Sequence, residues 1–378
     1  MDRYNPEPYP VALDYVSMRR GRHLSTGSSL ADFNCKGLLM KTYELFVGPD
    51  IAAETVSVAW HHPQTQQSGQ MEIAQKQVDY NRLCRQLIKL ADPARTLVVM
   101  EATGNYWLGL ALFLHHAGFV VSVINPIQSR HFARMQLQRT KTDAIDAQLL
   151  ADFAQMIQPE PWTPPPAICE QLQQRLAQRD AFLHMRTQER NRLHALRHNP
   201  NADKSILRRL QRHIRYLDKE ITALQREIEA LLLGDHAWGD SARRLLTVNG
   251  FGTIVTAWIL VATHNFARCD TPEQAASFAG LAPHAKDSGS SRRGRRTVGG
   301  SGHAALRKAL YMAAGSATRY NPPIKTFYER LVQNGKRKKV ARCAAARKLL
   351  HIAWAVVVKE QDFDPNYQSR SEIQKIAA

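Results

Sequence analysis

The order of apolar runs between residues 43 and 156 constrains the fold of this chain more than any other feature. Short apolar runs and period-two alternation predict strands at residues 43–49, 55–61, 71–74, 97–101 and 119–125. Helical spacing predicts helices at residues 80–90, 107–116 and 143–156. Three strands in succession, followed by strands that alternate with helices, predict an α/β domain built on one sheet.

Four carboxylates fall at particular points of this predicted domain. Asp50 and Glu101 each come where a predicted strand ends, and such ends gather at one edge of a parallel or mixed sheet. Asp143 and Asp146 are spaced i, i+3 on a predicted helix, so they point to the same side. Acids on strand ends and on one helical face are how ribonuclease-H-like folds hold magnesium against a phosphodiester. We therefore expect a ribonuclease-H-like domain in which these four acids bind Mg²⁺.

Each acid also has a structural alternative. Asp143 can cap its helix, Asp146 can be an ordinary exposed acid of the first turn, and Asp50 and Glu101 can be loop residues. Four acids that lie close together repel one another unless a cation lies between them. Their joint placement favours the metal site and a phosphoryl-transfer reaction on nucleic acid.

Changes in composition divide the rest of the chain. A Pro-rich stretch at residues 159–166 predicts a stiff linker. The run beyond it has apolar residues every three or four positions, as in a coiled coil, and His198-Asn199-Pro200-Asn201 interrupts it. Two antiparallel helices that self-associate are therefore expected; the alternative is a long helical segment that packs only on its own domain.

These breaks predict five segments in a chain too long for one ordinary core. The first lacks periodicity and is expected to be disordered, with Met40 as the hypothetical natural start. The segments are a disordered leader (1–39), a catalytic domain (40–160), an antiparallel coiled-coil hairpin (167–235), a mostly helical C-terminal domain (241–361) and a tail (362–378).

A formal charge of +18 and a pI near 9.9 indicate a polyanionic partner. Lys and Arg that neutralise phosphates release counterions, which favours nucleic-acid binding. Residues 286–348 hold 17 Lys and Arg against two acids, a net charge of +15. The predicted nucleic-acid contacts are Lys141, the backbone at Gly250 and Gly252, and the basic residues Arg292, Arg293, Arg295, Arg296, Arg307, Lys308, Lys336, Arg337, Lys338 and Lys339. The alternative for the two glycines is an ordinary pair of helix caps.

The cysteines and the hydropathy pattern indicate the cellular compartment of the protein. Five scattered cysteines without Cys-x-x-Cys spacing indicate neither a disulfide framework nor a zinc site, and they fit a reducing cytoplasm. No apolar run reaches the roughly 20 residues of a membrane helix, and no signal peptide is expected. We therefore expect a cytoplasmic protein.

A loop rich in Gly and Ser lies at the start of the basic stretch. Its Ser288, Ser290 and Ser291 stand beside the arginines of residues 292–296. Guanidinium groups can stabilise a serine alkoxide and the charged transition state of attack on phosphate. The alternative, which the residues alone favour, is a flexible linker with inert serines.

Two sets of motifs resemble those of one protein family, the DEDD transposases of the insertion sequence 110 family, which includes the Piv-type DNA invertases. The first set is Val47-Gly48-Pro49-Asp50, Glu101-Ala102-Thr103-Gly104 and the Lys-Thr-Asp-x-x-Asp run that ends at Asp146. The second set is Gly280-Leu281-Ala282-Pro283, Asp287-Ser288-Gly289 and residues 306–314. The resemblance extends from about Met40 to Val358. Pro49 departs from it, because the family usually has an aliphatic residue there and proline lacks a backbone donor.

The resemblance implies more than the spacing does. It implies a RuvC-like DEDD domain joined through a coiled coil to a C-terminal transposase domain, with Ser288 as the nucleophile. It implies a recombinase whose structured bridge RNA pairs with double-stranded donor and target DNA. It also implies dimers to tetramers in which the acids of one subunit approach the serine of another.

The combined expectation is that Ser288 attacks DNA beside the metal-bound acids and forms a phosphoserine link. One rival is a RuvC-like junction-resolving nuclease that uses water as the nucleophile. A second is a nucleic-acid scaffold without catalysis, which predicts that the four acids can be replaced without effect. Covalent adducts that survive denaturation would separate the recombinase from the nuclease.

Overall fold

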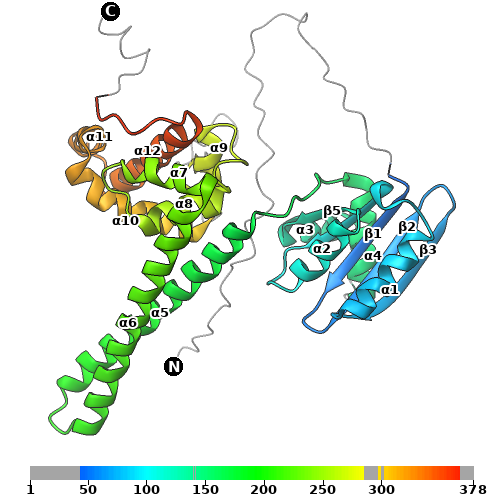
Figure 1. The fold of residues 1–378 in the computed structure, drawn as a ribbon, viewed down its shortest axis with the longest axis horizontal. Helices are drawn as coiled ribbons and strands as arrows, with labels where there is room; N and C mark the ends of the chain where they lie inside the picture. Colours follow the sequence, from blue (N-terminus) through cyan, green and yellow to red (C-terminus); the bar gives the residue numbers. More distant parts are fainter. Residues whose placement is uncertain (1–42, 139, 141, 285–296, 299–301, 367–378) are drawn as a thin grey trace, which may run out of the picture. The chain divides into compact units, whose positions relative to one another are not determined.

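The computed structural model of the protein describes residues 43–138, 140, 142–284, 297–298 and 302–366. The chain divides into an N-terminal unit that ends at Pro164 and a C-terminal unit that begins at Pro165. The N-terminal unit contains the larger sheet, and the C-terminal unit is almost entirely helical (Figure 1). The predicted combination of an α/β region and a helical C-terminal region is therefore confirmed.

One mixed sheet organises the N-terminal unit, with the strand order β3-β2-β1-β4-β5. Strands β1, β2 and β3 pair antiparallel, whereas β4 pairs parallel with β1 and with β5. The elements are β1 (Leu45–Ile51), β2 (Thr55–His62), β3 (Gln67–Ala74), α1 (Gln77–Ile88), the 3₁₀ helix η1 (Pro93–Arg95), β4 (Thr96–Glu101), α2 (Trp107–His116), β5 (Val120–Ile124), α3 (Pro126–Met135) and α4 (Asp143–Ile157).

Each face of this sheet has its own apolar core. One core joins Val47 and Met100 to side chains of α1 and α2. The other joins Phe46, Leu97 and Val99 to side chains of α3 and α4. Because side chains alternate along a strand, Asp50 lies on the same face as Phe46, and Glu101 lies on the same face as Val99. Both acids therefore belong to the face that α3 and α4 cover.

Gly48 lets α4 approach β1 at backbone distance. A Cβ atom at Gly48 would lie 2.3 Å from both the carbonyl oxygen of Ala147 and the amide nitrogen of Ala151. No side chain other than hydrogen fits such a contact. The approach occurs two residues before Asp50 and one residue after Asp146, so it holds the start of α4 beside the end of β1.

Two elements differ most from the sequence prediction. Strand β3 begins at Gln67, four residues before the predicted start, because its first half is a polar, exposed edge without an apolar pattern. Helix α3 was not predicted at all, although Asn125 caps it in a capping box with Gln128 and Pro126 occupies its first turn. That local signal was present in the sequence.

Two helices of 31 residues begin the C-terminal unit and pack antiparallel on each other. Arg186 donates to Asp218 at 2.8 Å, and Arg175 pairs with Glu227 at 3.2 Å, so the pairing advances in opposite directions along the two helices. They are α5 (Ala167–Arg197) and α6 (Lys204–Gly234). The helix break agrees with the Asn-Pro-Asn interruption, whereas self-association of the hairpin stays a prediction.

The remainder of the C-terminal unit is a helical cluster in which the apolar helix α8 packs against α10, α7 and the two long helices. Its elements are α7 (His236–Leu246), α8 (Thr253–Thr263), α9 (Pro272–Phe278), β6 (Pro283–His284), β7 (Thr297–Val298), α10 (Ala304–Tyr320), α11 (Pro322–Gln333) and α12 (Lys338–Val358). None of the helices that the structure describes combines the length and apolarity needed to span a membrane.

The stability of the C-terminal unit is expected to fall between pH 6.5 and about 4 because of His303. Its Nδ1 accepts a hydrogen bond from the Leu306 amide at 3.1 Å and caps α10, which requires the neutral ring. Burial lowers the pKa of His303 from 6.5 to about 4. In that window the unfolded chain binds a proton that the folded chain does not, so stability decreases as pH falls, by at most roughly 3 kcal/mol.

Urea unfolding followed by circular dichroism at several pH values measures this loss. The variant His303→Asn keeps a capping oxygen without a titrating ring, so its stability should depend less on pH. Part of the slope should persist, since burial also lowers the pKa of His264 to about 3. Equal pH profiles for the variant and the parent protein would contradict the role of His303.

Candidate active site

Asp50 and Glu101 occupy matching positions on neighbouring parallel strands. The observed pairs, from Leu45 with Thr96 to Val47 with Val98, set an offset of 51 residues between β1 and β4. The same offset, continued three residues further, sets Asp50 opposite Glu101. Both side chains are half-buried and lie on the face covered by α3 and α4.

Pro49 does not end the first strand, as the sequence prediction assumed. Strand β1 continues to Ile51, and its antiparallel pairing with β2 includes Pro49 and Asp50. Its recorded pairing with β4 ends at Val47, two residues before the proline. Asp50 is therefore the penultimate residue of a strand, where its backbone is held by β2.

Asp143 and Asp146 lie in the first turn of α4. Thr142 caps this helix by accepting from the amide of Ile145 at 3.3 Å, so Asp143 is not the capping residue. The helix runs opposite to β1, because Ala147 lies at Gly48 while Phe153 packs in the core of Phe46. The first turn of α4 is thus at the end of β1 that carries Asp50, with Asp143 exposed and Asp146 half-buried.

The carboxylate of Glu101 is held by two hydroxyl groups. Ser129 of α3, which is 3% exposed, forms a short hydrogen bond to Oε1, and Thr103 donates to Oε2 at 3.3 Å. The Ser129 Oγ also lies 2.9 Å from the carbonyl oxygen of Pro126. A hydroxyl has one proton, and the ionised carboxylate is the stronger acceptor, so the proton belongs to the Glu101 contact. Ser129 was not among the predicted site residues because α3 was not among the predicted helices.

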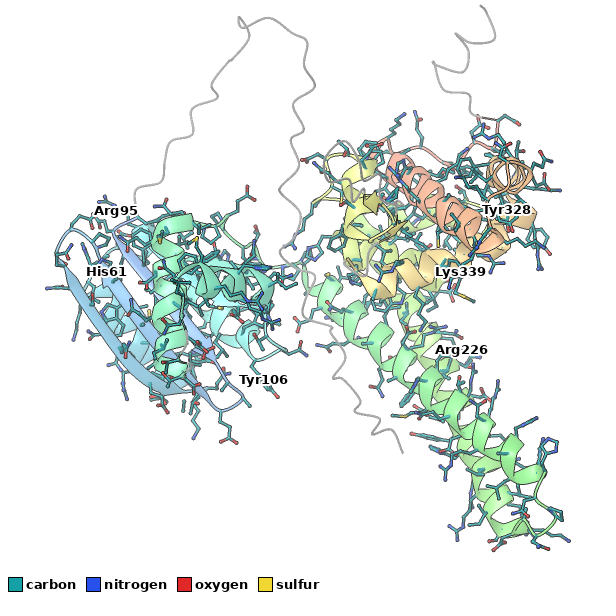
Figure 2. The ribbon with its side chains drawn as sticks, turned by 180° about the vertical axis from the view of Figure 1, so that it is seen from behind. His61, Arg95, Tyr106, Arg226, Tyr328 and Lys339 are labelled. Atoms are coloured by element: carbon teal, nitrogen blue, oxygen red, sulfur yellow. The ribbon has the colours of Figure 1, made fainter. Side chains whose placement is uncertain are left out.

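An exposed aromatic ring follows Glu101 closely in the chain. The loop between β4 and α2 turns at Gly104, whose φ of +59° is a conformation that suits glycine. It ends at Tyr106, which is 54% exposed and is labelled in Figure 2. A stacking surface for a nucleobase is thereby available five residues from Glu101.

The four acids supply the donor chemistry of a Mg²⁺ site, since hard carboxylate oxygens are the ligands that this ion prefers. The strand register, the shared sheet face and the start of α4 bring them to one region. Among the residues that the structure describes, however, no three His, Cys, Asp or Glu side chains form a group close enough to hold a metal ion. The backbone positions of the four acids are compatible with a shared Mg²⁺ ion. The carboxylate of Glu101, however, is hydrogen-bonded to Ser129.

Several predicted site residues lie outside the described residues. They are Lys141, the three candidate nucleophiles Ser288, Ser290 and Ser291, and the arginines Arg292, Arg293, Arg295 and Arg296.

Gly250 and Gly252 have different structural roles. Gly250 has a φ of +111°, and a Cβ atom there would lie 2.8 Å from the Cβ of Ala317 on α10, so helix packing accounts for it. Gly252 caps α8, and a Cβ atom there would meet nothing within 4 Å. The cap alternative therefore accounts for Gly252 and helix packing for Gly250, while phosphate binding at this turn stays a prediction.

The described basic residues separate into engaged and exposed groups. Arg307 donates to the carbonyl oxygen of Ala279 at 3.3 Å, and Lys308 lies 3.5 Å from Asp180. Four further residues are exposed at the start of α12, namely Lys336, Arg337, Lys338 and Lys339, the last of which Figure 2 labels. Those four are the better placed for contacts with phosphates.

Known proteins of the family that the motifs indicate match this chain. The DEDD transposase model of IS110, described as a transposase, matches residues 47–198, and the model described as "Transposase IS116/IS110/IS902 family" matches residues 242–329. The pilin gene-inverting protein of Moraxella bovis is 34% identical over 269 residues, which cover 71% of this chain and 81% of that protein. Its counterpart in Moraxella lacunata is 33% identical with the same coverage. The transposase for insertion sequence element IS1328 of Yersinia enterocolitica is 25% identical over 296 residues, 70% of this chain and 84% of the relative.

The two family models match in the order in which the two sets of motifs occur, and the resemblance inferred from those motifs is confirmed. The sequence similarity to the pilin gene-inverting protein of Moraxella bovis extends over most of the length of both chains. The chain therefore belongs to the IS110 family of transposases and DNA invertases, and it is a DNA recombination enzyme.

Proposed function

We propose that this protein cleaves and rejoins double-stranded DNA with a ribonuclease-H-like DEDD site and a serine nucleophile. The catalytic acids are Asp50, Glu101, Asp143 and Asp146, and the nucleophile is Ser288. The observation that carries the proposal is the convergence of acids from β1, β4 and α4 on one face of the sheet. The four acids come from three separate elements, β1, β4 and α4, and the start of α4 lies beside the end of β1.

The acids would hold Mg²⁺, which when bound supplies a Lewis acid for the scissile phosphate. The family itself suggests a divalent metal. Ser129 and Thr103 fix the orientation of Glu101, and Gly48 fixes the distance between β1 and the acids of α4. These residues position the acids before substrate binds, so less reorganisation is required at the phosphate.

The reaction at Ser288 preserves a phosphodiester. The Ser288 Oγ loses its proton and forms a bond to phosphorus, while the bond from phosphorus to one sugar oxygen breaks and that oxygen takes up a proton. Attack by the freed sugar hydroxyl of another strand reverses the step and releases the serine. The arginines at positions 292, 293, 295 and 296 would neutralise phosphate charge in both steps.

The partners follow from the same proposal. Donor and target DNA are recognised through a structured bridge RNA that pairs with both, in the cytoplasm of a bacterium and at its nucleoid. Dimers to tetramers assemble through the α5–α6 hairpin, which forms a coiled coil. Support for the assembly comes from the exposed apolar side chains Met185, Ile206 and Tyr216 on these two helices.

Replacement of Ser288 with Ala is expected to abolish covalent protein–DNA adducts and to leave DNA binding unchanged. The reason is that only Oγ is removed, while the acids and the basic residues remain. Adducts are measured on denaturing gels after incubation of labelled DNA with the protein, its RNA and Mg²⁺. Ser290→Ala and Ser291→Ala are the matched controls and should still form adducts.

A wild-type protein that cleaves DNA without forming an adduct would favour the junction-resolving nuclease instead. Normal recombination by the Ser288→Ala variant would refute the nucleophile. If Ser290→Ala or Ser291→Ala alone loses the adduct, the nucleophile is that serine.

A further inference from the structure

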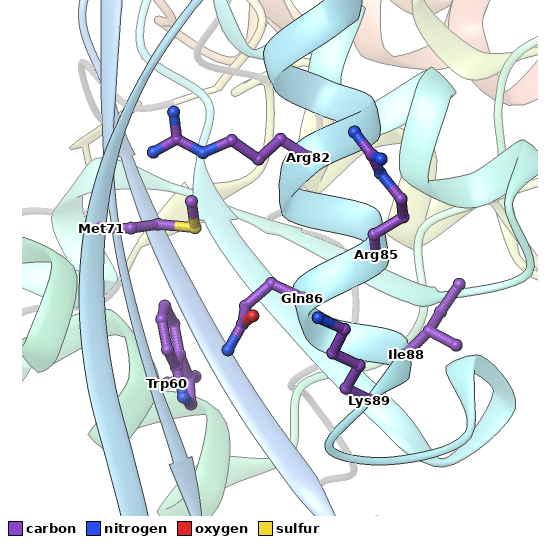
Figure 3. A pocket seen from close by; sticks show the side chains of 7 residues that line it. All are labelled: Trp60, Met71, Arg82, Arg85, Gln86, Ile88 and Lys89. Carbon is purple, nitrogen blue, oxygen red and sulfur yellow. The ribbon is translucent and has the colours of Figure 1, made fainter.

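A pocket with a basic rim lies on the face of the sheet opposite the four acids. An open pocket of about 560 Å³ lies between α1 and the strands β2 and β3 (Figure 3). This volume lies within the range of pockets that bind small ligands, roughly 300–1,000 Å³. The lining residues are Trp60, Met71, Arg82, Arg85, Gln86, Ile88 and Lys89. Trp60 belongs to the core shared with α1 and α2, so this pocket is separate from the DEDD site.

The floor of the pocket is apolar, and its indole, that of Trp60, is 8% exposed. Trp60 pairs across the strands with Gly69, and a Cβ atom at Gly69 would lie 2.4 Å from Cζ2 of the indole. The indole therefore lies directly over the glycine of the edge strand. Met71, two residues along β3, is half-buried beside it. An aromatic ring and a thioether in this arrangement suit contact with a planar base.

The rim of the pocket is cationic. Arg82, Arg85 and Lys89 are exposed, and none of the seven lining residues is an acid. Figure 3 shows Arg82 reaching from α1 toward Met71, with Gln86 between α1 and Trp60. Arg82 pairs with Asp79 of the same helix at 3.7 Å, and a pair in which the guanidinium is exposed contributes little. Three positive charges around an apolar floor favour a ligand that is both anionic and planar.

We propose that this pocket binds an unpaired nucleotide of a nucleic-acid strand. The base lies against Trp60 and Met71, the amide of Gln86 contacts the base edge, and adjacent phosphates bind Arg82, Arg85 and Lys89. A paired and stacked base cannot reach the floor, so the site selects single strands over duplex. The inference rests on the proposed function only in taking nucleic acid as the partner. The strand is either DNA or RNA, which share this chemistry.

The test measures binding of fluorescein-labelled single-stranded DNA, single-stranded RNA and duplex DNA to the full-length protein in EDTA. Gln86→Glu places a carboxylate among the three cations without a change of shape and should weaken single-strand binding on the order of tenfold at low salt. The triple variant Arg82→Gln, Arg85→Gln, Lys89→Gln should lower the slope of log affinity on log salt by about 2, since each single-strand phosphate contributes about 0.7. Loss with one of the two single strands identifies the ligand.

The matched control removes three charges from the same unit outside the pocket, in Lys76→Gln, Arg95→Gln, Arg134→Gln. It should bind single strands more tightly than the pocket variant. Equal losses in the two triple variants, or unchanged binding in the pocket variant, would overturn the proposal. Because EDTA removes metal chemistry, binding is independent of the DEDD and serine steps. Adduct formation by the wild-type protein reports on those steps separately.

Discussion

The Glu101→Gln variant is expected to fold like the parent protein and to cleave DNA about 10³-fold more slowly. Glutamine has nearly the same shape and can still accept from Ser129 through its carbonyl oxygen. It lacks the negative charge that a divalent cation requires. A factor of 10³ corresponds to about 4 kcal/mol of transition-state stabilisation, a magnitude that a lost metal ligand accounts for.

Single-turnover cleavage of labelled donor DNA in Mg²⁺ measures this effect, and circular dichroism verifies the fold. Glu160→Gln removes the same charge from an exposed position after α4 and should cleave at the parent rate. Ser129→Ala leaves the carboxylate but removes its buried donor, so an intermediate loss of about 10- to 100-fold is expected. Cleavage near the parent rate by both Glu101→Gln and Asp50→Asn would show that these acids are not the ligands of a catalytic metal.

The positions of the acids were predictable because the signals that carry them are local. A strand that ends in a polar residue, or a pair of acids one turn apart, can be recognised within a few residues of sequence. The family motifs then added the serine, which lies outside the described residues. What the pattern could not supply is the register of β1 against β4, whose offset of 51 residues ends at Val47 with Val98 and sets Asp50 opposite Glu101 when it is continued.

The residues that hold the acids in place were harder to predict. Ser129 acquires its role only because β5 and α3 return the chain to Glu101, and no spacing between residues 101 and 129 reveals that. Gly48 was part of a motif, yet its purpose depends on a helix one hundred residues later in the chain. Contacts between distant segments decide these roles, so a sequence pattern can indicate the proposed ligands of a site but not the residues that position them.

Gly48→Ala is expected to be the most destabilising small substitution in the N-terminal unit. The added methyl group would lie 2.3 Å from two backbone atoms of α4 and 2.7 Å from the carbonyl carbon of Leu150. Backbone atoms cannot rotate away as a side chain does, so the whole helix must move. Overpacking of this kind costs typically 1 to 3 kcal/mol, and we expect a value at or above the upper end, about 3 kcal/mol.

Urea unfolding of the full-length protein, followed by near-UV circular dichroism, measures the loss. Gly109→Ala is the matched control, because it adds the same methyl group within α2, where the nearest atom, Oη of Tyr80, would be 3.7 Å away. A helical Gly→Ala change without a clash should stabilise by up to about 1 kcal/mol. Equal stabilities for the two variants would show that α4 does not depend on close contact at Gly48. If instead Gly48→Ala folds in part and loses cleavage more than stability, then the displaced helix has carried Asp146 away from Asp50, and the packing of one glycine sets the geometry of the site.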